Sequence, residues 1–429
     1  MHTLEQLRSG ALAGTRRLDL ACGLTQVPAE VFDLADSLEV LNLTGNHLDA
    51  LPPDMGRLKR LRVLFASNNR FTVVPESLGD CPSLETVGFR ANRIGLVPAA
   101  SLPASLRSLV LTDNLLERLP ERLGLMPNLQ KLMLTGNRLC GLPETLAAAS
   151  ALELLRLAAN QLGRWPTELG QLPRLAWLAL AGNPCSEAGS ASDALPKVDW
   201  SELAVRDRLG EGASGEVFEV RAGCRPHLAL KLFKGTMGSD GLPDDELLVG
   251  AGVAAHPAVM TPVAQLQGHP EHRKGVLMPL LPAAWQDLAA PPSLERCTRD
   301  VYPVPWRIGA AQAWRLAGDV ASAVAHLHAH GVMHGDLYAH NIRWDSATGQ
   351  AILCDLGAAT RLPMHCPDLA GKMMALEVRA FGCLVEELAS GVLDSATSAS
   401  LQQLADACLQ TDPAERPTMA MCRERLRRA

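Results

Sequence analysis

The sequence lacks the features of membrane, secreted and nucleic-acid-binding proteins. It has no run of about 18 apolar residues, the length that a membrane-spanning helix needs, and residues 1–17 lack the apolar core of a signal peptide. Its eleven cysteines are an odd number without a C-x-x-C pair, which argues against a disulfide framework or a zinc site. No basic stripe faces a nucleic-acid backbone, and the formal net charge is −6. We therefore expect a cytoplasmic protein, or one delivered into a host cell, with no membrane or nucleic-acid partner.

The amino-terminal half contains an internal repeat. Asparagines recur every 23 residues, with one step of 22, at Asn46, Asn69, Asn92, Asn114, Asn137, Asn160 and Asn183. Leucines keep the same step, so that Leu109, Leu111 and Leu116 are echoed by Leu132, Leu134 and Leu139. The pattern resembles leucine-rich repeats. One such repeat cannot bury its own apolar face, and neighbours must stack into a continuous core. The resemblance implies an α/β solenoid of about eight repeats after a short amino-terminal cap, with the asparagines in a buried ladder.

Residues that alternate with the buried leucines are expected on the concave face of this solenoid. Several of them are apolar, namely Phe65, Val110, Met133, Leu154 and Trp177. An exposed apolar stripe often marks a binding surface, which predicts a protein substrate or partner here. The alternative is that these side chains fill a tightly curved inner face or touch the second domain.

A chain of 429 residues is long enough for two domains, each with its own core. The repeat pattern stops after Asn183, and the next stretch is rich in Gly and Ser, as flexible connections are. We therefore predict a repeat domain at 1–184, a linker at 185–197 and a second domain at 198–429.

Four motifs of the second domain occur in a fixed order. They are a Gly-rich loop, Gly210-Glu211-Gly212-Ala213-Ser214-Gly215-Glu216-Val217; a strand with a lysine, Leu228-Ala229-Leu230-Lys231; the run His334-Gly335-Asp336 with Asn341 five residues later; and Asp355-Leu356-Gly357. Glycines let backbone N–H groups approach phosphates. An ordinary hairpin turn explains the first motif alone but not the ordered set.

The set resembles the protein-kinase family, and most closely bacterial kinases of the eukaryotic type. The resemblance implies a bilobal α+β domain that binds ATP and Mg²⁺. Asp336 would orient the attacking hydroxyl, Asn341 and Asp355 would bind the metal, and Lys231 would contact the α and β phosphates. The glutamate partner of Lys231 would be Glu246, with Asp244 and Asp245 as alternatives. The competing explanation for all three acids is that they stabilise the start of a helix through its dipole.

The resemblance also places the nucleotide. Its phosphates would lie under the Gly-rich loop and its adenine against a hinge, where Met278 is the gatekeeper, Pro279 offers a carbonyl and Leu281 an N–H. The full set of nucleotide-binding residues is Gly210, Gly212, Ser214, Gly215, Val217, Ala229, Lys231, Met278, Pro279 and Leu281.

Three departures from the family pattern bear on function. Gly335 stands where regulated kinases carry an arginine that binds a phosphorylated activation loop. Tyr338 replaces the catalytic-loop lysine, although His340 stands where tyrosine kinases carry arginine. The segment after Asp355 is short, has no A-P-E motif, and contains Thr360 as its only hydroxyl residue.

These features predict an ATP-dependent serine/threonine-protein kinase that needs no activation-loop phosphorylation and finds its targets through the repeats. Two alternatives stay open. One is a nucleotide-binding pseudokinase scaffold that acts through the repeat surface. The other is a kinase for a small molecule, which the His334-Gly335-Asp336 sequence suggests.

Overall fold

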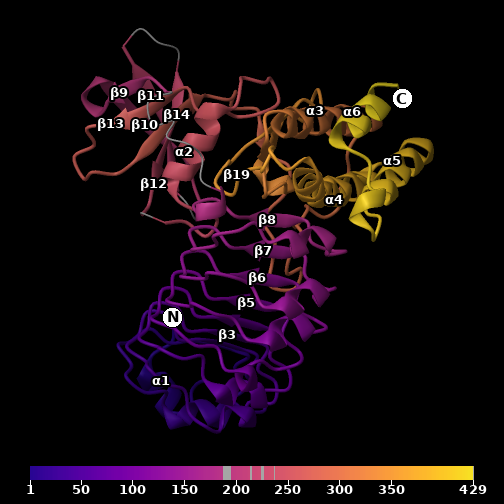
Figure 1. Ribbon diagram of the computed structural model, residues 1–429. Helices are drawn as coiled ribbons and strands as arrows, with labels where there is room; N and C mark the ends of the chain where they lie inside the picture. The colour runs from indigo at the N-terminus through magenta and orange to yellow at the C-terminus, as the bar shows by residue number, and fades with distance from the viewer. Residues whose placement is uncertain (187–194, 213–214, 224–226, 236, 429) are drawn as a thin grey trace. The chain divides into compact units, whose positions relative to one another are not determined.

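The computed structural model describes residues 1–186, 195–212, 215–223, 227–235 and 237–428 (Figure 1). Contacts group the chain into two compact units, Met1–Arg174 and Leu175–Ala429. The predicted domain limits at 184 and 198 fall later than this division and stay predictions, and most of the predicted linker lies outside the described residues. No helix among the described residues is long and apolar enough to cross a lipid bilayer.

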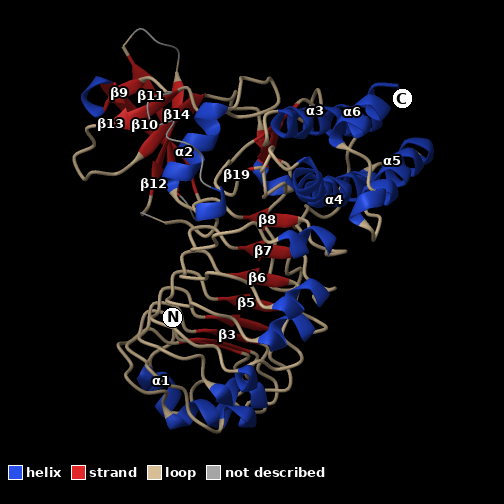
Figure 2. Cartoon of the chain, viewed as in Figure 1, coloured by secondary structure: helices blue, strands red, loops and turns tan. Residues whose placement is uncertain are grey.

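The first unit is a parallel ladder of three-residue strands in sequence order. After the short helix α1 (Leu4–Arg8) come β1 (Arg17–Asp19), β2 (Val40–Asn42), β3 (Val63–Phe65), β4 (Thr86–Gly88), β5 (Ser108–Val110), β6 (Lys131–Met133) and β7 (Leu154–Arg156). Neighbouring strands pair in register, so that Leu109 lies beside Leu132, one repeat later. Figure 2 shows these strands stacked, with short helical turns along one side of the stack.

The repeat pattern explains this ladder. Leu109 and Leu132 at the strand centres are fully buried. Asn137 lies in the turn that follows β6, where its Nδ2 donates to the carbonyls of Leu111 and Leu134, each at 2.9 Å. Its Oδ1 accepts the N–H of Leu116 at 3.0 Å. The asparagine therefore replaces backbone partners that a tight turn cannot supply, and the predicted leucine-rich-repeat solenoid is confirmed.

The residues predicted to face a partner differ in accessibility. Phe65, Val110 and Met133 are half-buried, whereas Leu154 is buried at 5% exposure. Their role in binding stays a prediction. The fifth residue, Trp177, belongs by its contacts to the second unit, in strand β8 (Trp177–Ala179).

The second unit begins with β8 and then forms a six-stranded sheet in the order β10-β11-β12-β14-β13-β9. Its strands are β9 (Lys197–Asp199), β10 (Leu203–Glu211), β11 (Gly215–Ala222), β12 (Leu228–Phe233), β13 (Ala264–Gln267) and β14 (Gly275–Pro279). Helix α2 (Pro243–Gly252) follows β12. Leu230 and Leu277 lie fully buried in the hydrophobic core of the sheet, and Trp200 packs against this core.

The rest of the second unit is mainly helical. Its helices are α3 (Ala310–Ala329), α4 (Pro367–Gly391), α5 (Ser395–Cys408) and α6 (Met419–Arg428). Two small sheets accompany them, β15 (Gln286–Asp287) with β17 (Ile342–Trp344) and β18 (Ala351–Leu353), and β16 (Val332–Met333) with β19 (Thr360–Arg361). Figure 1 shows β9–β14 and α2 grouped apart from α3–α6. Residues 334–341, which carry the third motif, connect β16 to β17.

Candidate functional site

Three charged side chains from distant elements meet in the second unit. Lys231 on β12 places its Nζ 2.8 Å from Glu246 Oε1 on α2 and 3.2 Å from Asp355 Oδ1 after β18. Lys231 also lies 3.0 Å from Glu246 Oε2, so the ammonium bonds both oxygens of that carboxylate. Of the three acids considered for this pairing, Asp244 instead binds Lys274.

Burial and charge act against each other in this cluster. Burial by itself lowers the pKa of Lys231, but the carboxylates of Asp355 and Glu246 outweigh it and raise that pKa. Burial opposes the ionisation of Asp355, yet Lys231 lowers the pKa of Asp355 below its usual range. Burial raises the pKa of Glu246 to about 7, against the charge of Lys231. One cation thus serves two carboxylates, an imbalance that favours an added divalent cation.

The cluster lies in a cleft of about 540 Å³. Every predicted nucleotide-binding residue that the structure describes lines this cleft: Gly210, Gly212, Gly215, Val217, Ala229, Lys231, Met278, Pro279 and Leu281. Glu246, Asn341 and Asp355 line it as well. The remaining predicted residue, Ser214, lies outside the described residues. A cleft of this volume matches the usual size of small-molecule sites.

The glycines of the loop differ in what requires them. A Cβ on Gly215 would lie 2.6 Å from the carbonyl oxygen of Leu232, so packing against β12 excludes a side chain there. At Gly210 and Gly212 a Cβ would meet nothing within 4 Å. These two positions leave open space at the mouth of the cleft, which a phosphate group could use.

The segment 334–341 forms a hydrogen-bonded loop around Asp336. Asn341 Nδ2 donates to the Asp336 carboxylate at 2.7 Å and to its carbonyl at 2.9 Å. The Asp336 N–H donates to His334 Nδ1 at 3.2 Å. Because Nδ1 accepts, His334 carries its proton on Nε2, which lies 3.0 Å from the Cys354 carbonyl. Asp336 and Asn341 are therefore held together, beside the residue that precedes Asp355.

The oxygens near this loop suit magnesium. Asn341 uses its Nδ2 on Asp336, which leaves the amide Oδ1 as a ligand, and Asp355 uses Oδ1 on Lys231, which leaves Oδ2. The side chain of Asp355 is 40% exposed. Among the described residues no cluster of three His, Cys, Asp or Glu side chains could hold a metal. Mg²⁺ commonly takes one or two protein ligands together with phosphates and water, so the residues present fit a metal that binds with a nucleotide.

Glu377 on α4 is a residue that the sequence interpretation missed. Its carboxylate accepts the N–H of Gly335 at 2.7 Å, the N–H of His334 at 3.2 Å and His328 Nε2 at 2.8 Å. The side chain is 1% exposed. Burial raises its pKa, but these hydrogen bonds and the nearby histidines outweigh burial and lower it. Its position in an apolar stretch of α4 was the one sequence signal of a buried, structurally required acid.

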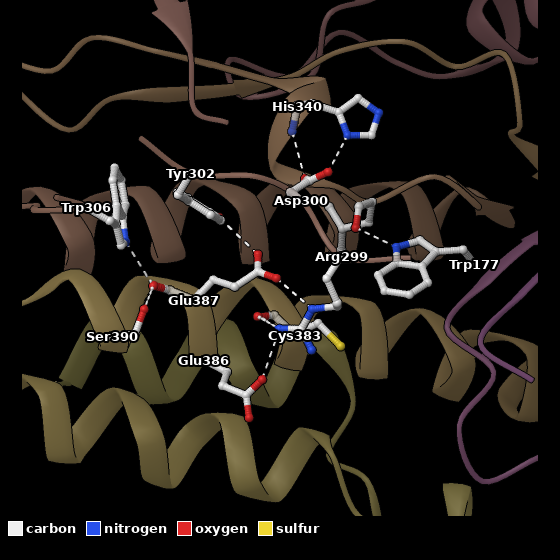
Figure 3. Close-up of polar contacts among 11 residues, drawn as sticks. Trp177, Arg299, Asp300, Tyr302, Trp306, His340, Cys383, Glu386, Glu387 and Ser390 are labelled. Carbon is white, nitrogen blue, oxygen red and sulfur yellow. Dashed lines mark hydrogen bonds and ion pairs between the residues drawn. The ribbon is translucent and has the colours of Figure 1, made fainter. Parts of the chain in front are cut away.

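Asp300 is a second missed residue. Its carboxylate accepts the backbone N–H of His340 at 3.0 Å and lies 2.7 Å from His340 Nδ1 (Figure 3). Burial lowers the pKa of His340, but Asp300 outweighs it and raises that pKa. The neighbouring residue Arg299 binds Glu386 and Glu387 on α4 at 3.0 and 2.7 Å. Residues 299–300 therefore tie the loop to α4.

The segment after Asp355 leads almost directly into α4. Only residues 358–366 separate Gly357 from Pro367, where α4 begins. Thr360, its one hydroxyl residue, is fully buried, and its Oγ1 accepts the N–H of Leu180 at 3.1 Å. A kinase could not reach this hydroxyl in the folded chain. Arg416 is buried and donates to the carbonyls of Gln410 and Ala375, each at 2.9 Å.

Comparisons with known proteins find a family match in each of the two units. Residues 36–94 match the family described as Leucine rich repeat, and residues 286–363 match the Lipopolysaccharide kinase (Kdo/WaaP) family. The second match includes Asp336, Asn341 and Asp355. The chain thus contains one stretch similar to leucine-rich repeats and one stretch similar to a kinase family.

Two curated relatives match shorter stretches. The Probable inactive serine/threonine-protein kinase roco10 of Dictyostelium discoideum is 32% identical over 111 residues, 24% of this chain and 4% of that protein. The human Leucine-rich repeat and IQ domain-containing protein 4 is 38% identical over 55 residues, 13% of this chain and 10% of that protein. The chain therefore spans a tenth or less of either relative. A solved leucine-rich-repeat protein of Leptospira interrogans is 28% identical with a TM-score of 0.36, over 43% of this chain and 53% of that one.

Proposed function

We propose that residues 198–429 form a bilobal domain of the protein-kinase type, which transfers the γ-phosphate of ATP to a hydroxyl group. The leucine-rich repeats would recruit the target. The observation that carries this proposal is the meeting of Lys231 with Glu246 and Asp355 in one cleft, at 2.8 and 3.2 Å. Phosphoryl transfer depends mainly on positioning and charge stabilisation, and these are what such a cluster supplies.

In the proposed reaction the acceptor hydroxyl oxygen attacks the γ-phosphorus. The bond from that phosphorus to the oxygen bridging the β and γ phosphates breaks, and ADP leaves. The hydroxyl proton passes to the Asp336 carboxylate, which Asn341 orients. Lys231, held by Glu246, would bind the α and β phosphates. Magnesium, held by Asn341 and Asp355, would neutralise the phosphate charge.

Two acceptor classes have support. A serine or threonine of a protein is favoured by the repeats, because repeat arrays provide extended binding surfaces; Phe65, Val110 and Met133 are the half-buried candidates for contact. A sugar hydroxyl is favoured by the match of residues 286–363 to lipopolysaccharide kinases. The short segment 358–366 also favours it, since ordinary protein kinases bind peptides on a longer one. Because Thr360 is buried, we propose activity without activation-loop phosphorylation in either case.

The test uses the full chain with Mg²⁺ and γ-labelled ATP, and offers lysate proteins and a panel of sugars as separate acceptors. We expect transfer by the wild type and a rate lower by roughly 10²- to 10⁴-fold for Asp336→Ala, because the general base is lost. Asp406→Ala, an exposed aspartate of the same unit, is the matched control and should leave the rate unchanged. Absence of both transfer and ADP formation in the wild type refutes the kinase proposal. A rise in Tm with Mg²⁺-ATP under that outcome would support the pseudokinase scaffold.

A further inference from the structure

The catalytic-loop residues between Asp336 and Asn341 contact an aromatic side chain from far earlier in the sequence. The Trp177 ring, on β8, stacks on the Tyr338 ring with centroids 4.2 Å apart and planes 7° from parallel. Its Nε1 donates to the carbonyl of Leu337 at 2.9 Å, the bond drawn as a dashed line from the labelled Trp177 in Figure 3. Trp177 is only 2% exposed. The contact is therefore directional and shielded from bulk solvent.

Residues that closely follow Trp177 in the sequence approach both the loop 334–341 and the segment after Asp355. A Cβ on Gly335 would lie 2.4 Å from the carbonyl oxygen of Leu178, so only glycine fits beside β8. The N–H of Leu180, one residue past β8, donates to Thr360 Oγ1 in the segment after Asp355. The position where regulated kinases carry an arginine thus faces the backbone of this strand.

Asp300 fixes the loop at its other end. It binds both the backbone N–H and the ring of His340, and the Tyr338 and His340 rings lie 5.0 Å apart. Trp177, Tyr338, His340 and Asp300 therefore form a continuous row of contacts along the loop. This row begins two residues after Asp336 and ends next to Asn341.

Trp177 also stands out among the residues at its place in the repeat. The equivalent strand positions hold Val40, Val63, Thr86, Ser108, Lys131 and Leu154, and none of these can offer a ring N–H. A buried indole N–H without an acceptor is costly, so tryptophan is suited to a site where a fixed carbonyl receives it. The Leu337 carbonyl is such an acceptor.

We propose that Trp177 is a positioning residue for phosphoryl transfer, which holds Leu337 and Tyr338 so that Asp336 and Asn341 keep their reactive geometry. This proposal rests on the proposed kinase function. Strand β8 would then hold this loop in its reactive geometry, as a phosphorylated activation segment does in regulated kinases. Trp177 stacks on Tyr338 and bonds Leu337, so its proposed effect acts through the loop.

The experiment compares Trp177→Ala and Trp177→Phe with the wild type. Phenylalanine can keep the stacking on Tyr338 but cannot donate to Leu337. Val63→Ala is the matched control, since Val63 is buried at the same repeat position in the first unit. For each variant we would measure kcat, the KM for ATP, Tm, and hydrogen exchange of the His340 and Asn341 amides without nucleotide.

For Trp177→Ala we expect kcat to fall by on the order of 10²-fold, the size of effect caused by a small misplacement of a catalytic group. The KM for ATP should stay within about twofold, because uniform nucleotide binding is not affected. Trp177→Phe should lie between Trp177→Ala and the wild type, and Val63→Ala should lower Tm alone. The two amides should exchange faster in Trp177→Ala.

Tyr338→Ala adds a second test, because it removes the stacking partner. Its effect on kcat should not add to that of Trp177→Ala if the two rings act as one unit. An unchanged kcat in Trp177→Ala overturns the proposal even if Tm falls or the amides exchange faster. If the wild type shows no turnover, the kinase proposal fails. In that case hydrogen exchange of the His340 and Asn341 amides still tests whether Trp177 holds the loop. Unchanged exchange in Trp177→Ala would show that it does not.

Discussion

The two units differ in how far along the sequence their important contacts reach. In the first unit Asn137 bonds residues 3 and 26 positions away. In the second unit Lys231 bonds Asp355 at 124 positions, and Trp177 bonds Leu337 at 160. The contacts of a repeat join residues within one or two repeat lengths of each other in the sequence. The candidate site, in contrast, forms only when segments far apart in the sequence pack together. Mutations should therefore act locally in the first unit and affect the whole site in the second.

The largest effect is expected from Gly335→Ala in the second unit. The new Cβ would lie 2.4 Å from the Leu178 carbonyl and 2.8 Å from that of Ala358, at a φ of +75°. Strain and overpacking together should cost about 3–4 kcal/mol in the free energy of unfolding. Chemical denaturation would measure it. Gly318→Ala is the matched control, because that helical position has no atom within 4 Å of a Cβ and should be neutral or stabilising. Equal effects at both glycines would contradict the packing of β8 on the loop.

Glu377→Gln should have the next largest effect. The substitution removes the charge that accepts the N–H groups of His334 and Gly335, and hydrogen bonds to a charged group are worth about 2–3 kcal/mol. Urea denaturation of both proteins at several pH values would measure the loss. Glu415→Gln, an exposed change in the same unit, serves as control.

The pH dependence of this difference has a definite sign. The folded-state pKa of Glu377 is lower than its ordinary value of 4.5. Its contribution to stability is then fully present above pH 4.5 and disappears as the pH falls through the lowered value. The gap between wild type and Glu377→Gln should therefore narrow in acid and stay constant near neutrality. A gap that widens in acid would contradict this account.

Asn137→Ala tests the local character of the first unit. It leaves the Leu116 N–H without its side-chain acceptor. It also removes one of the two side-chain amides that donate to each of the buried carbonyls of Leu111 and Leu134. The expected loss is about 2 kcal/mol, measured as a lower Tm with unchanged kcat. Asn128→Ala removes one exposed bond to the Ala104 carbonyl and should cost much less. A large fall in kcat for Asn137→Ala, at a temperature where both proteins are folded, would contradict the expectation that mutations in the first unit act locally.

The smallest effect is expected at the surface of the ladder. Arg62 and Glu85 lie one repeat apart and form an exposed ion pair at 2.9 Å. Arg62→Ala should cost less than about 1 kcal/mol. Repeating the denaturation at about 1 M salt should remove most of the difference, because the charges are then screened. A larger, salt-insensitive loss would show that packing of the arginine stem matters more than its charge.

Motifs with fixed spacing allowed the residues of the ladder and of the cleft to be chosen from the sequence. The asparagine period predicted the ladder, and the residues chosen for the cleft, from Gly210 to Leu281, line it wherever the structure describes them. Glu246 was chosen over Asp244 and Asp245, and it is the acid that contacts Lys231. The roles of these residues in catalysis stay proposals. Glu377 and Asp300 could not be found in this way, because the residues around a buried acid in the sequence do not identify its partner.

Trp177 shows most clearly where sequence reasoning stopped. Its place in the repeat predicted an apolar residue on the concave face, which would contact a partner, fill the curved inner face or touch the second domain. The choice between these depends on a contact across 160 positions, and no local pattern encodes that.

Periodicity and motif order were enough to predict a stacked repeat and to select residue types that suit phosphate and metal binding, because each depends on near neighbours and on side-chain chemistry. The pairing of Lys231 with two carboxylates, the burial of Thr360 and the stacking of Trp177 on Tyr338 depend on how β8, α2 and the loop before β17 pack together. Such packing is set by the shape and burial of the whole unit, which is why folding alone brings these residues into contact.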